Sequence, residues 1–247
     1  MAFSNNLLAA IDLLQIHGFI DALSESPLDR GTVLFEPGDP TNQVYFPTGA
    51  VLSVITLMSD GRAVESSTIG SESGGPLLSA LAGEVTRNRI LAQIGGAAMK
   101  LPSAKLRTAA GGHPKLMSLL LRHACAISQQ AEQGVACNVL HEADSRLARW
   151  ILMTQDRTGS ASVPLTQEHM AVMTGVQRTT ISAVASELRH KGLIRYRRGV
   201  LEVVDRSGLE AIACECYTVI RQSFDELRPS KDEPAEMGKS RRSRYGA

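Results

Sequence analysis

Residues 170–194, MAVMTGVQRTTISAVASELRHKGLI, decide how this 247-residue chain is interpreted. A run of helix-forming residues is broken by Thr174-Gly175 and resumes on an arginine followed by two threonines. Glycine accepts the positive φ of a tight turn, so the pattern predicts two helices joined at an angle. Two structures fit such a pair: a plain helical hairpin, or a helix-turn-helix that presents its second helix to DNA.

The flanking residues extend this unit in both directions. Thr166 is a suitable N-cap for the first helix, and the second helix is expected over residues 178–190. Gly192 then stands where a left-handed residue ends a helix. Residues 193–204, LIRYRRGVLEVV, alternate around Arg-Gly and predict a β-hairpin.

The second helix carries short polar residues on the face opposite its apolar side. Arg178, Thr179, Ser182, Ala183 and Ser186 share that face. Arginine can donate two bonds to a guanine edge, serine and threonine can bond bases or phosphates, and alanine can meet a thymine methyl. These side chains therefore fit a helix in a major groove. The alternative is that they are the solvated side of a hairpin.

Positive charge is concentrated in the same region. Residues 176–198 contain six Arg and Lys residues against one acid, whereas residues 1–112 contain seven against ten. A basic cluster with Tyr196 among its members follows the second helix: Arg189, Lys191, Arg195, Arg197 and Arg198. Such a cluster can hold the phosphates that flank a reading helix, which favours the DNA-binding interpretation.

The overall composition limits the class of protein. Hydrophobic residues make up 43% and the net charge is +1, so a full core can form but no overall field draws the chain to nucleic acid or a membrane. No apolar run approaches the roughly 20 residues of a membrane helix, and the first 20 residues lack the features of a signal peptide. Four cysteines suit reduced thiols, so we expect a cytoplasmic protein without a membrane partner.

The residue pattern of the N-terminal half is typical of a β-domain. After a predicted helix at residues 5–20, short alternating runs separated by turn residues extend from Arg30 to Pro102. Asp60-Gly61 supplies a hairpin turn between β-branched arms, and Gly95-Gly96 separates two further strands. Many short strands predict an antiparallel sandwich or barrel.

Helical periodicity begins after Gly111-Gly112. A long helix is expected from near Pro114, followed by helices at residues 141–156 and 207–227 and a disordered tail at 229–247. One narrow stripe of the long helix suits packing against a second helix: Leu116, Leu120, Ala124, Ile127 and Ala131. The alternative is that this stripe lies on the chain's own barrel.

The chain has a β-rich N-terminal domain, then a long helix, then the stretch LTQEHMAVMTGVQRTTISAVASELRHKGLIRYRRG at residues 165–199. In this order of elements and in this stretch it resembles the Crp/Fnr family of bacterial transcription regulators. The resemblance covers about residues 5–215 and is most specific at 145–205. It implies an α+β fold: a cyclic-nucleotide-binding-like jelly roll that senses an effector at 1–112, a dimerisation helix at 113–140 and a winged helix-turn-helix at 141–228. The implied partners are a second copy, a two-fold-symmetric double-stranded DNA operator and RNA polymerase.

The resemblance also implies which residues touch DNA. The base-reading positions are Gln177, Arg178, Thr179, Ser182 and Ala183. The backbone contacts are Thr166 and Gln167 together with the basic cluster at residues 189–198. Thr179 replaces an acid that many members carry, and Ala183 replaces a second base-reading arginine. The usual operator of the family therefore cannot be assumed.

The resemblance places an effector pocket at Gly74, Gly75, Arg87, Asn88 and Arg89. Gly74-Gly75 stands where cyclic-nucleotide-binding relatives have Gly-Glu, so the ribose-binding carboxylate is missing, and Asn88 stands where a small hydroxyl residue is expected. Loss of that acid removes charge-assisted hydrogen bonds of about 1.5–3 kcal/mol each, which disfavours cyclic AMP. A cyclic-nucleotide-responsive regulator that keeps phosphate binding through Arg87 is the alternative.

No cofactor is expected. The first cysteine is Cys125, so the N-terminal iron–sulfur motif of oxygen-sensing relatives is missing. Cys125 and Cys137 are about 120° apart on a helix, and Cys214 and Cys216 about 200°, so buried inert thiols and no metal site are expected. Residues 18–112 contain no histidine for a metal-binding barrel enzyme, so no enzyme is expected. A ligand-binding or protein-interaction module that does not bind DNA is the remaining alternative.

Overall fold

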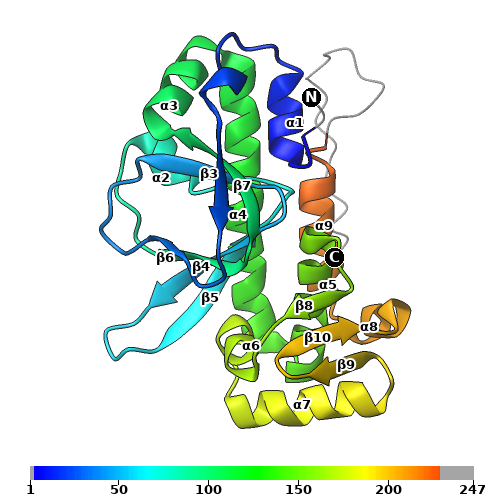
Figure 1. Cartoon of the computed structure of the whole chain (residues 1–247). Helices are drawn as coiled ribbons and strands as arrows, with labels where there is room; N and C mark the ends of the chain where they lie inside the picture. The colour runs from blue at the N-terminus through cyan, green and yellow to red at the C-terminus, as the bar shows by residue number, and fades with distance from the viewer. Residues whose placement is uncertain (1–2, 229–247) are drawn as a thin grey trace, which may run out of the picture.

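The computed structural model describes residues 3–228, and the predicted tail at 229–247 lies outside them. A β-domain lies along one side of a long central helix, and a helical unit with a small sheet lies at its lower end (Figure 1). The elements of the β-domain are α1 (Asn6–Asp12), a 3-10 turn (Ile20–Ala22), β1 (Ser24–Leu28), β2 (Val33–Phe35), β3 (Gln43–Pro47), β4 (Val51–Leu57), β5 (Ala63–Ile69), α2 (Leu77–Ala82), β6 (Arg89–Ile94), β7 (Gly96–Pro102) and α3 (Ser103–Gly112).

The remaining elements follow along the chain. They are α4 (Pro114–Leu140), α5 (Ala143–Thr158), β8 (Ser162–Pro164), α6 (Gln167–Thr174), α7 (Arg178–His190), β9 (Ile194–Arg197), β10 (Val200–Val203), α8 (Arg206–Ile212) and α9 (Cys216–Asp225). None of the helices in residues 3–228 is long and apolar enough to cross a membrane.

The predicted antiparallel β-domain is confirmed. Its two sheets have the strand orders β1-β7-β3 and β2-β6-β4-β5, and every pairing is antiparallel. Gly61 takes φ +86° in the β4–β5 loop, as the Asp60-Gly61 turn requires. Between the sheets Leu52, Ile90 and Ala92 are buried, because alternate residues of each strand point inward.

Two helices of this domain differ from the prediction. The first helix ends at Asp12, well short of Ile20, since Gln15 and Gly18 both take positive φ and turn the chain back. The helix at Ser103–Gly112 was not predicted, because Leu106 is its only large apolar residue and two glycines stand at its end.

The stripe predicted for dimerisation is instead used within the chain. Leu116, Leu120 and Ala124 are buried in the core of the β-domain, Ile127 packs against the same core, and Ala131 is half-buried. The assignment of this face to a partner helix was therefore wrong. The physical reason is that the side of the β-domain needs a cover, and an amphipathic helix supplies it with its larger apolar face.

The predicted single helix at residues 207–227 is divided into α8 and α9. Ala213 is extended, with ψ 141°, and separates them. The expected 200° between Cys214 and Cys216 was therefore wrong, because Cys214 precedes the helix that Cys216 begins. Cys137, Cys214 and Cys216 are buried as expected, whereas Cys125 is exposed.

The two halves of the molecule are joined by buried polar contacts. Trp150 Nε1 on α5 donates to Glu65 Oε1 on β5 at 3.0 Å. Arg157 Nε, also on α5, donates to Glu72 Oε1 at 2.8 Å, and its Nη2 donates to Gln130 on α4 at 2.5 Å. The helical unit is thus attached both to the β-domain and to the long helix.

Candidate nucleic-acid interface

The predicted helix pair is formed by α6 and α7. Thr166 caps α6, since its hydroxyl accepts from His169 N at 3.2 Å. Gly175 ends α6 with φ +64°, and α7 begins at Arg178. The N-cap residue Gln177 makes no side-chain bond to the first turn of α7, so the N–H groups of that turn are free of a side-chain cap. Such N–H groups can bind a phosphate.

One face of α7 holds it against the domain. Ile181, Ala185 and Leu188 are buried in a core that also contains Met170 of α6 and Trp150 of α5. The spacing of four and three residues between the buried side chains of α7 fixes its rotation about its own axis. The opposite face must therefore point out of the molecule, where α7 forms its lower edge (Figure 1).

All five predicted base-reading residues lie outside the core. Gln177, Arg178, Thr179 and Ala183 are exposed, and Ser182 is half-buried. Ser182 Oγ lies 2.8 Å from Gln167 Oε1 and 2.9 Å from Arg178 O, so its proton is used inside the domain. The Ser182–Gln167 contact ties the start of α6 to α7.

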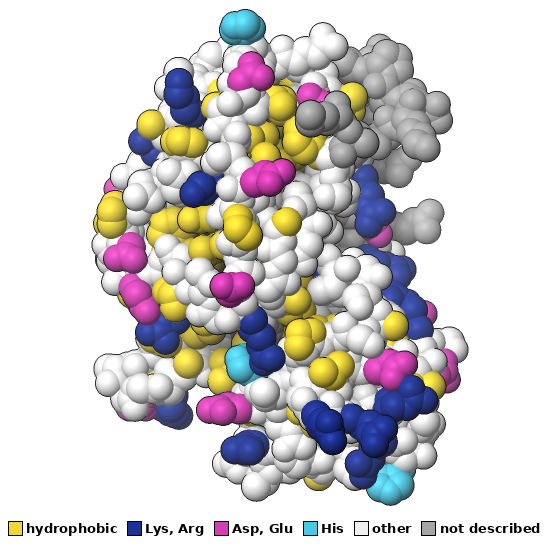
Figure 2. Space-filling view, in the orientation of Figure 1, with side chains coloured by type: hydrophobic (Ala, Val, Ile, Leu, Met, Phe, Trp, Pro, Cys, Tyr) yellow, Lys and Arg dark blue, Asp and Glu magenta, His cyan; other side chains and the backbone are white. Residues whose placement is uncertain are grey.

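A two-residue turn presents the basic tip of the β9–β10 hairpin. Arg197 pairs with Val200 across the hairpin, and Arg198 and Gly199 between them take φ +48° and +76°. We call β9, β10 and this turn the wing. Positive φ is unusual for arginine, and both consecutive arginines at this tip are exposed. Figure 2 shows Lys and Arg side chains gathered in the lower part of the molecule.

The basic cluster divides into paired and unpaired cations. Lys191 Nζ lies 2.6 Å from Glu187 Oε1, and Arg195 Nη1 lies 2.6 Å from Glu202 Oε2. Within residues 3–228 no salt bridge forms to the remaining members or to Arg178. These unpaired members are Arg189, Arg197 and Arg198. Exposed pairs are worth little, so the paired cations can exchange a carboxylate for a phosphate.

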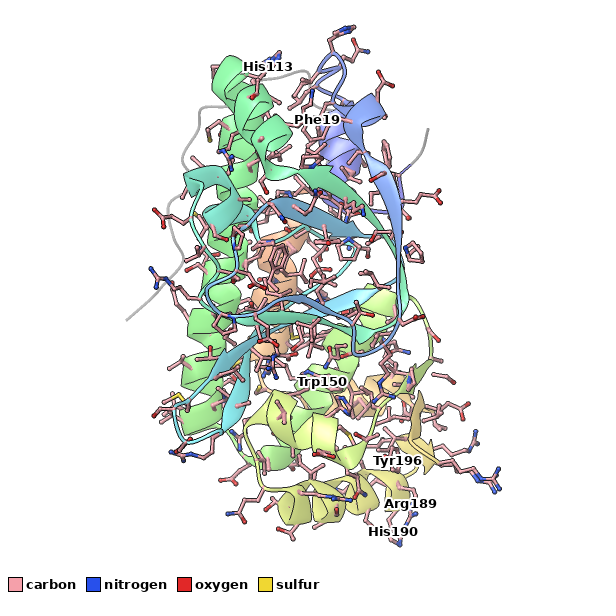
Figure 3. All side chains as sticks on the ribbon, turned by 60° about the vertical axis from the view of Figure 1, so that its left-hand side comes forward. Phe19, His113, Trp150, Arg189, His190 and Tyr196 are labelled. Atoms are coloured by element: carbon pink, nitrogen blue, oxygen red, sulfur yellow. The ribbon has the colours of Figure 1, made fainter. Side chains whose placement is uncertain are left out.

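Tyr196 has a structural role in this region. Its hydroxyl donates to Leu165 O at 3.0 Å and its ring packs on the core. It therefore fixes the wing to the segment that enters α6. Figure 3 shows Tyr196 near Arg189 and His190, at the end of the molecule where α7 and the wing lie.

A cavity of about 310 Å³ lies between the β-domain and α4. Its wall combines apolar side chains with hydroxyl groups and includes Arg87 and Asn88, two of the five predicted pocket residues. Arg87 is exposed, and the Asn88 amide donates to Thr56 Oγ1 at 2.9 Å. The helix α4 contributes Ala124, Ile127, Ser128 and Ala131. A molecule in this cavity would therefore touch the long helix.

The other three predicted pocket residues are not among those that line this cavity. Arg89 is paired with Glu36 at 2.9 Å. A Cβ on Gly74 would lie 2.6 Å from the Phe46 ring, and one on Gly75 would lie 2.3 Å from Ile69 Cδ1. Gly74 is therefore required by close packing inside the β-domain, whereas at Gly75 the nearest atom is the end of the flexible Ile69 side chain.

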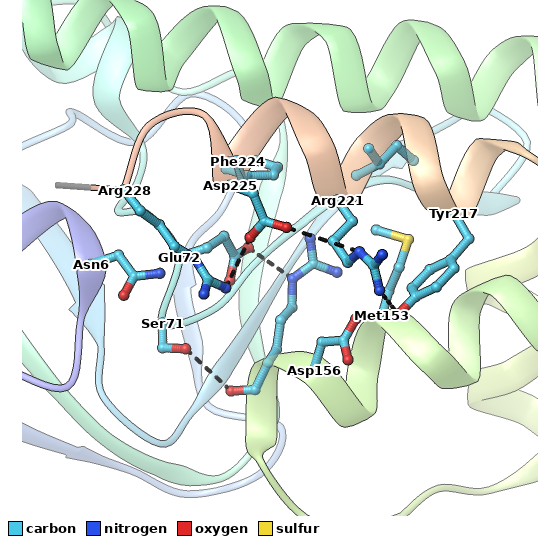
Figure 4. Close-up of a pocket in the computed structure, with 12 residues that line it drawn as sticks. Asn6, Ser71, Glu72, Met153, Asp156, Tyr217, Arg221, Phe224, Asp225 and Arg228 are labelled. Atoms are coloured by element: carbon cyan, nitrogen blue, oxygen red, sulfur yellow. Dashed lines mark hydrogen bonds and ion pairs between the residues drawn. The ribbon is translucent and has the colours of Figure 1, made fainter. Parts of the chain in front are cut away.

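A second, smaller cavity lies where α1, α5 and α9 approach one another. It has a volume of about 70 Å³ and is lined by Glu72, Asp156, Arg157, Tyr217 and Arg221, among others (Figure 4). Tyr217 Oη donates to Asp156 at 2.7 Å, and Arg206 pairs with the same carboxylate at 2.8 Å. Sequence reasoning missed this polar network, since its members are far apart in the chain and follow no motif. Its bonds are satisfied within the chain, which suits a structural joint.

Comparison with known proteins supports these assignments at the level of domain and fold. The sequence model of the Crp-like helix-turn-helix domain matches residues 145–212. Among solved structures, FixK2 from Bradyrhizobium japonicum matches with a TM-score of 0.68 and 18% identity, over 78% of this chain and 98% of that one. TTHB099, a transcriptional regulator of the CRP family from Thermus thermophilus, matches with a TM-score of 0.65 and 21% identity, over 76% and 96%. No curated protein sequence matches the chain.

The match to the domain family and the matches to solved structures agree. The sequence match covers α5 to α8 and contains the whole of α6, α7 and the wing. The structural matches cover 78% and 76% of the chain and so extend well beyond these residues. Residues 145–212 are thus a Crp-like helix-turn-helix domain, and the described chain as a whole has the fold of the Crp/Fnr family of transcription regulators.

Proposed function

We propose that the chain is a sequence-specific DNA-binding transcription regulator in which α7 enters the major groove. One observation carries the proposal: α7 exposes a polar face that begins at Arg178, and the same helix contacts β9 of the wing, whose tip carries two unpaired arginines. A groove-reading helix needs outward polar side chains, and cations beside it hold the flanking phosphates.

Each residue has a role in this proposal. Arg178 donates two bonds to a guanine edge, and Gln177 and Thr179 read neighbouring bases. Ala183 meets a thymine methyl. Ser182 retains only acceptor capacity, because its proton is used by Gln167 or Arg178 O. The phosphate contacts belong to Thr166 and Gln167 at the start of α6, and to Arg189, Lys191, Arg195, Arg197 and Arg198.

A homodimer is the second part of the proposal, and the outer face of α4 supports it. Residues on this face recur at alternating spacings of three and four: Ser118, Leu121, Cys125, Ser128, Glu132, Val135 and Val139. Leu121, Val135 and Val139 are 45%, 69% and 78% exposed, which is unusual for apolar side chains. This is the heptad spacing of a coiled-coil seam, and it lies away from the stripe that covers the β-domain.

Two-fold symmetry through α4 would place one recognition helix in each half of an operator. Half-sites read by such dimers lie about 34–36 Å apart, one turn of DNA. The proposed operator is therefore a short inverted repeat. Recruitment or exclusion of RNA polymerase at a promoter, in the cytoplasm where the DNA lies, would be the regulatory output.

The cavity beside α4 suits an effector site. Its apolar and hydroxyl-bearing wall fits a small, mostly apolar ligand better than cyclic AMP, because Gly74-Gly75 provides no carboxylate for a ribose. Since α4 forms part of the wall, a ligand there could change how the two long helices pack and thereby the spacing of the two α7 helices. A cyclic nucleotide held through Arg87 is the second candidate, because Arg87 lines the cavity.

DNA affinity measured by fluorescence anisotropy tests the proposal. Duplexes are first selected from a random pool, and Arg178→Ala is compared with Lys105→Ala, a control that removes an exposed cation on α3. We expect Arg178→Ala to weaken specific binding by about 1–3 kcal/mol and the control to change nothing. Equal affinities for wild type and both variants would favour the protein-interaction module and refute the DNA reader.

A further inference from the structure

Three cysteines and one histidine converge where α4 gives way to α5. Cys137 and His141 stand at the C-terminal end of α4, and Cys214 and Cys216 at the junction of α8 and α9. Their donor atoms all lie within 4.8 Å of one another. We call these four residues the hinge cluster. They are brought together from positions more than 70 residues apart, so the folded chain, not local sequence, creates the cluster.

The spacing of the donor atoms fits one tetrahedral ion. Cys137 Sγ and Cys214 Sγ lie 3.5 Å apart, and Cys216 Sγ lies 3.5 Å from His141 Nδ1. With zinc–sulfur bonds of about 2.3 Å, a tetrahedron has edges of about 3.8 Å. Three thiolates and one imidazole nitrogen are a common donor set for a structural zinc ion. A multi-iron cluster would need donors spread around a larger core.

Two neighbours hold the donors in a binding orientation. His141 Nε2, the nitrogen remote from the cysteines, lies 3.3 Å from Glu215 Oε1. A carboxylate on the second nitrogen of a histidine fixes its tautomer and directs the first nitrogen to a metal. Gln133 Nε2 donates to Cys216 Sγ at 3.1 Å, the kind of bond that stabilises a metal-bound thiolate.

Charge balance supports an anionic centre at this position. Arg149 on α5 is buried, its Nε has no hydrogen-bond partner, and its Nη1 contacts Met153 Sδ at 3.5 Å. A buried cation needs a countercharge. The Arg149 guanidinium is close enough to Cys137 and to Glu65 to interact with both through its charge. Three thiolates around a divalent ion carry one net negative charge, which would offset Arg149.

We propose that the hinge cluster binds one divalent thiophilic metal ion, Zn²⁺ in the cell, through Cys137, His141, Cys214 and Cys216. Binding releases the three thiol protons to solvent and leaves the histidine neutral. The ion joins the end of α4 to the α8–α9 junction and so fixes the connection between the long helix and the DNA-binding unit. The site is independent of the effector cavity, whose lining residues belong to other segments.

Metal content and cobalt substitution test this site in the full-length protein. Purified under reducing conditions, the wild type should contain about one zinc per chain by mass spectrometry. After chelation and addition of Co²⁺, it should show the absorption bands of tetrahedral cobalt with thiolate ligands. The cobalt titration needs no variant, so it stands even where a substitution impairs folding.

Matched variants identify the ligands. Cys137→Ser, Cys216→Ser and His141→Ala should lose the metal, whereas Cys125→Ser and His17→Ala, which change exposed residues of the same types, should keep it. Glu215→Gln should bind the ion roughly 10–100-fold more weakly, because it acts by positioning His141. Circular dichroism checks that each variant is folded.

Several results would overturn the proposal. One is a wild-type chain that holds no zinc and gives no tetrahedral cobalt spectrum. Another is the presence of iron with acid-labile sulfide in place of one divalent ion. The last two are a Cys137–Cys214 disulfide that persists under reducing conditions and equal metal loss in Cys125→Ser and Cys137→Ser. None of these bears on whether α7 binds DNA.

Discussion

Arg157 Nε lies 2.8 Å from Glu72 Oε1, and the two side chains are only 7% and 13% exposed. This ion pair joins α5 to the segment that follows β5 and is the most buried salt bridge within residues 3–228. Its position, with Gln130 of α4 on the other side of the guanidinium, makes it the polar contact at which three parts of the chain meet.

Removing one partner of this pair should destabilise the protein strongly. Glu72→Ala leaves a buried guanidinium without a countercharge, so we expect a loss of about 3–5 kcal/mol in the free energy of unfolding. The double change Glu72→Met with Arg157→Met should cost much less, because no charge stays buried. Urea unfolding measures both. A double variant as unstable as Glu72→Ala would show that shape, not charge, governs this contact.

Glu65 should make the stability of the junction depend on pH. Burial raises the pKa of this carboxyl from 4.5 to about 7, against the opposing hydrogen bonds from Ser53 and Trp150. The unfolded chain therefore ionises Glu65 first as the pH rises, and stability is lost between about pH 4.5 and 7. Glu65→Gln should be more stable than wild type at pH 8 by an amount on the order of 3 kcal/mol, since each pKa unit is about 1.4 kcal/mol.

The comparison of these two proteins isolates Glu65, because every other titrating group is common to both. The difference in unfolding free energy should shrink toward zero near pH 4.5. Thermal unfolding at a series of pH values measures it. A difference that does not vary with pH would mean that folding leaves the pKa of Glu65 unshifted.

Replacing Arg198 with Asn should raise the stability of the wing and weaken DNA binding. The φ of +48° at Arg198 is the conformation that Asn and Gly adopt most easily, so Arg198→Asn should stabilise the wing by about 0.5–1 kcal/mol. The same change removes a phosphate contact and should lower the salt dependence of DNA binding by about one unit. Arg197→Gln is the control: it removes an equal charge from a strand position, so it should affect the salt slope alone. If Arg198→Asn destabilises the protein, its side chain has a structural contact instead.

Cys125 gives a direct test of the proposed dimer. It is exposed and is the third of the seven residues of the outer heptad stripe of α4, so in a parallel pair of helices the two copies of Cys125 face each other. Mild oxidation should yield a disulfide-linked dimer on a gel, and Cys125→Ser should not.

Replacing Val135 and Val139 with Glu should convert the protein to a monomer in analytical ultracentrifugation. A wild type that sediments as a monomer at micromolar concentration contradicts the dimer.

The local features of the fold were predictable from the sequence where backbone chemistry determines them. The Thr166 cap, the turn at Gly175 and the bounds of α7 follow from residue types that tolerate few other conformations. The face of α4 that covers the β-domain was not predictable, because Leu116 and Leu121 begin two apolar stripes on one helix and only the tertiary structure shows which is covered.

Contacts between distant segments of the chain also could not be predicted from the sequence. The hinge cluster and the Glu72–Arg157 pair join residues 75 to 85 positions apart, and no spacing rule connects them. The predicted angle of 200° between Cys214 and Cys216 was wrong because it assumed one continuous helix. The residues around Ala213 are all tolerated in helices, so the sequence does not indicate the break there.

The central claim is that the exposed face of α7 reads bases in a DNA groove, and the base preference of Arg178→Ala tests it most directly. Wild type and variant are each allowed to select from the same random duplex pool, and the bound sequences are counted position by position. Wild type should select an inverted repeat, and the variant should lose its preference at one symmetric pair of positions while keeping the rest. Identical profiles for the two proteins, or no enriched sequence for wild type, would contradict the account.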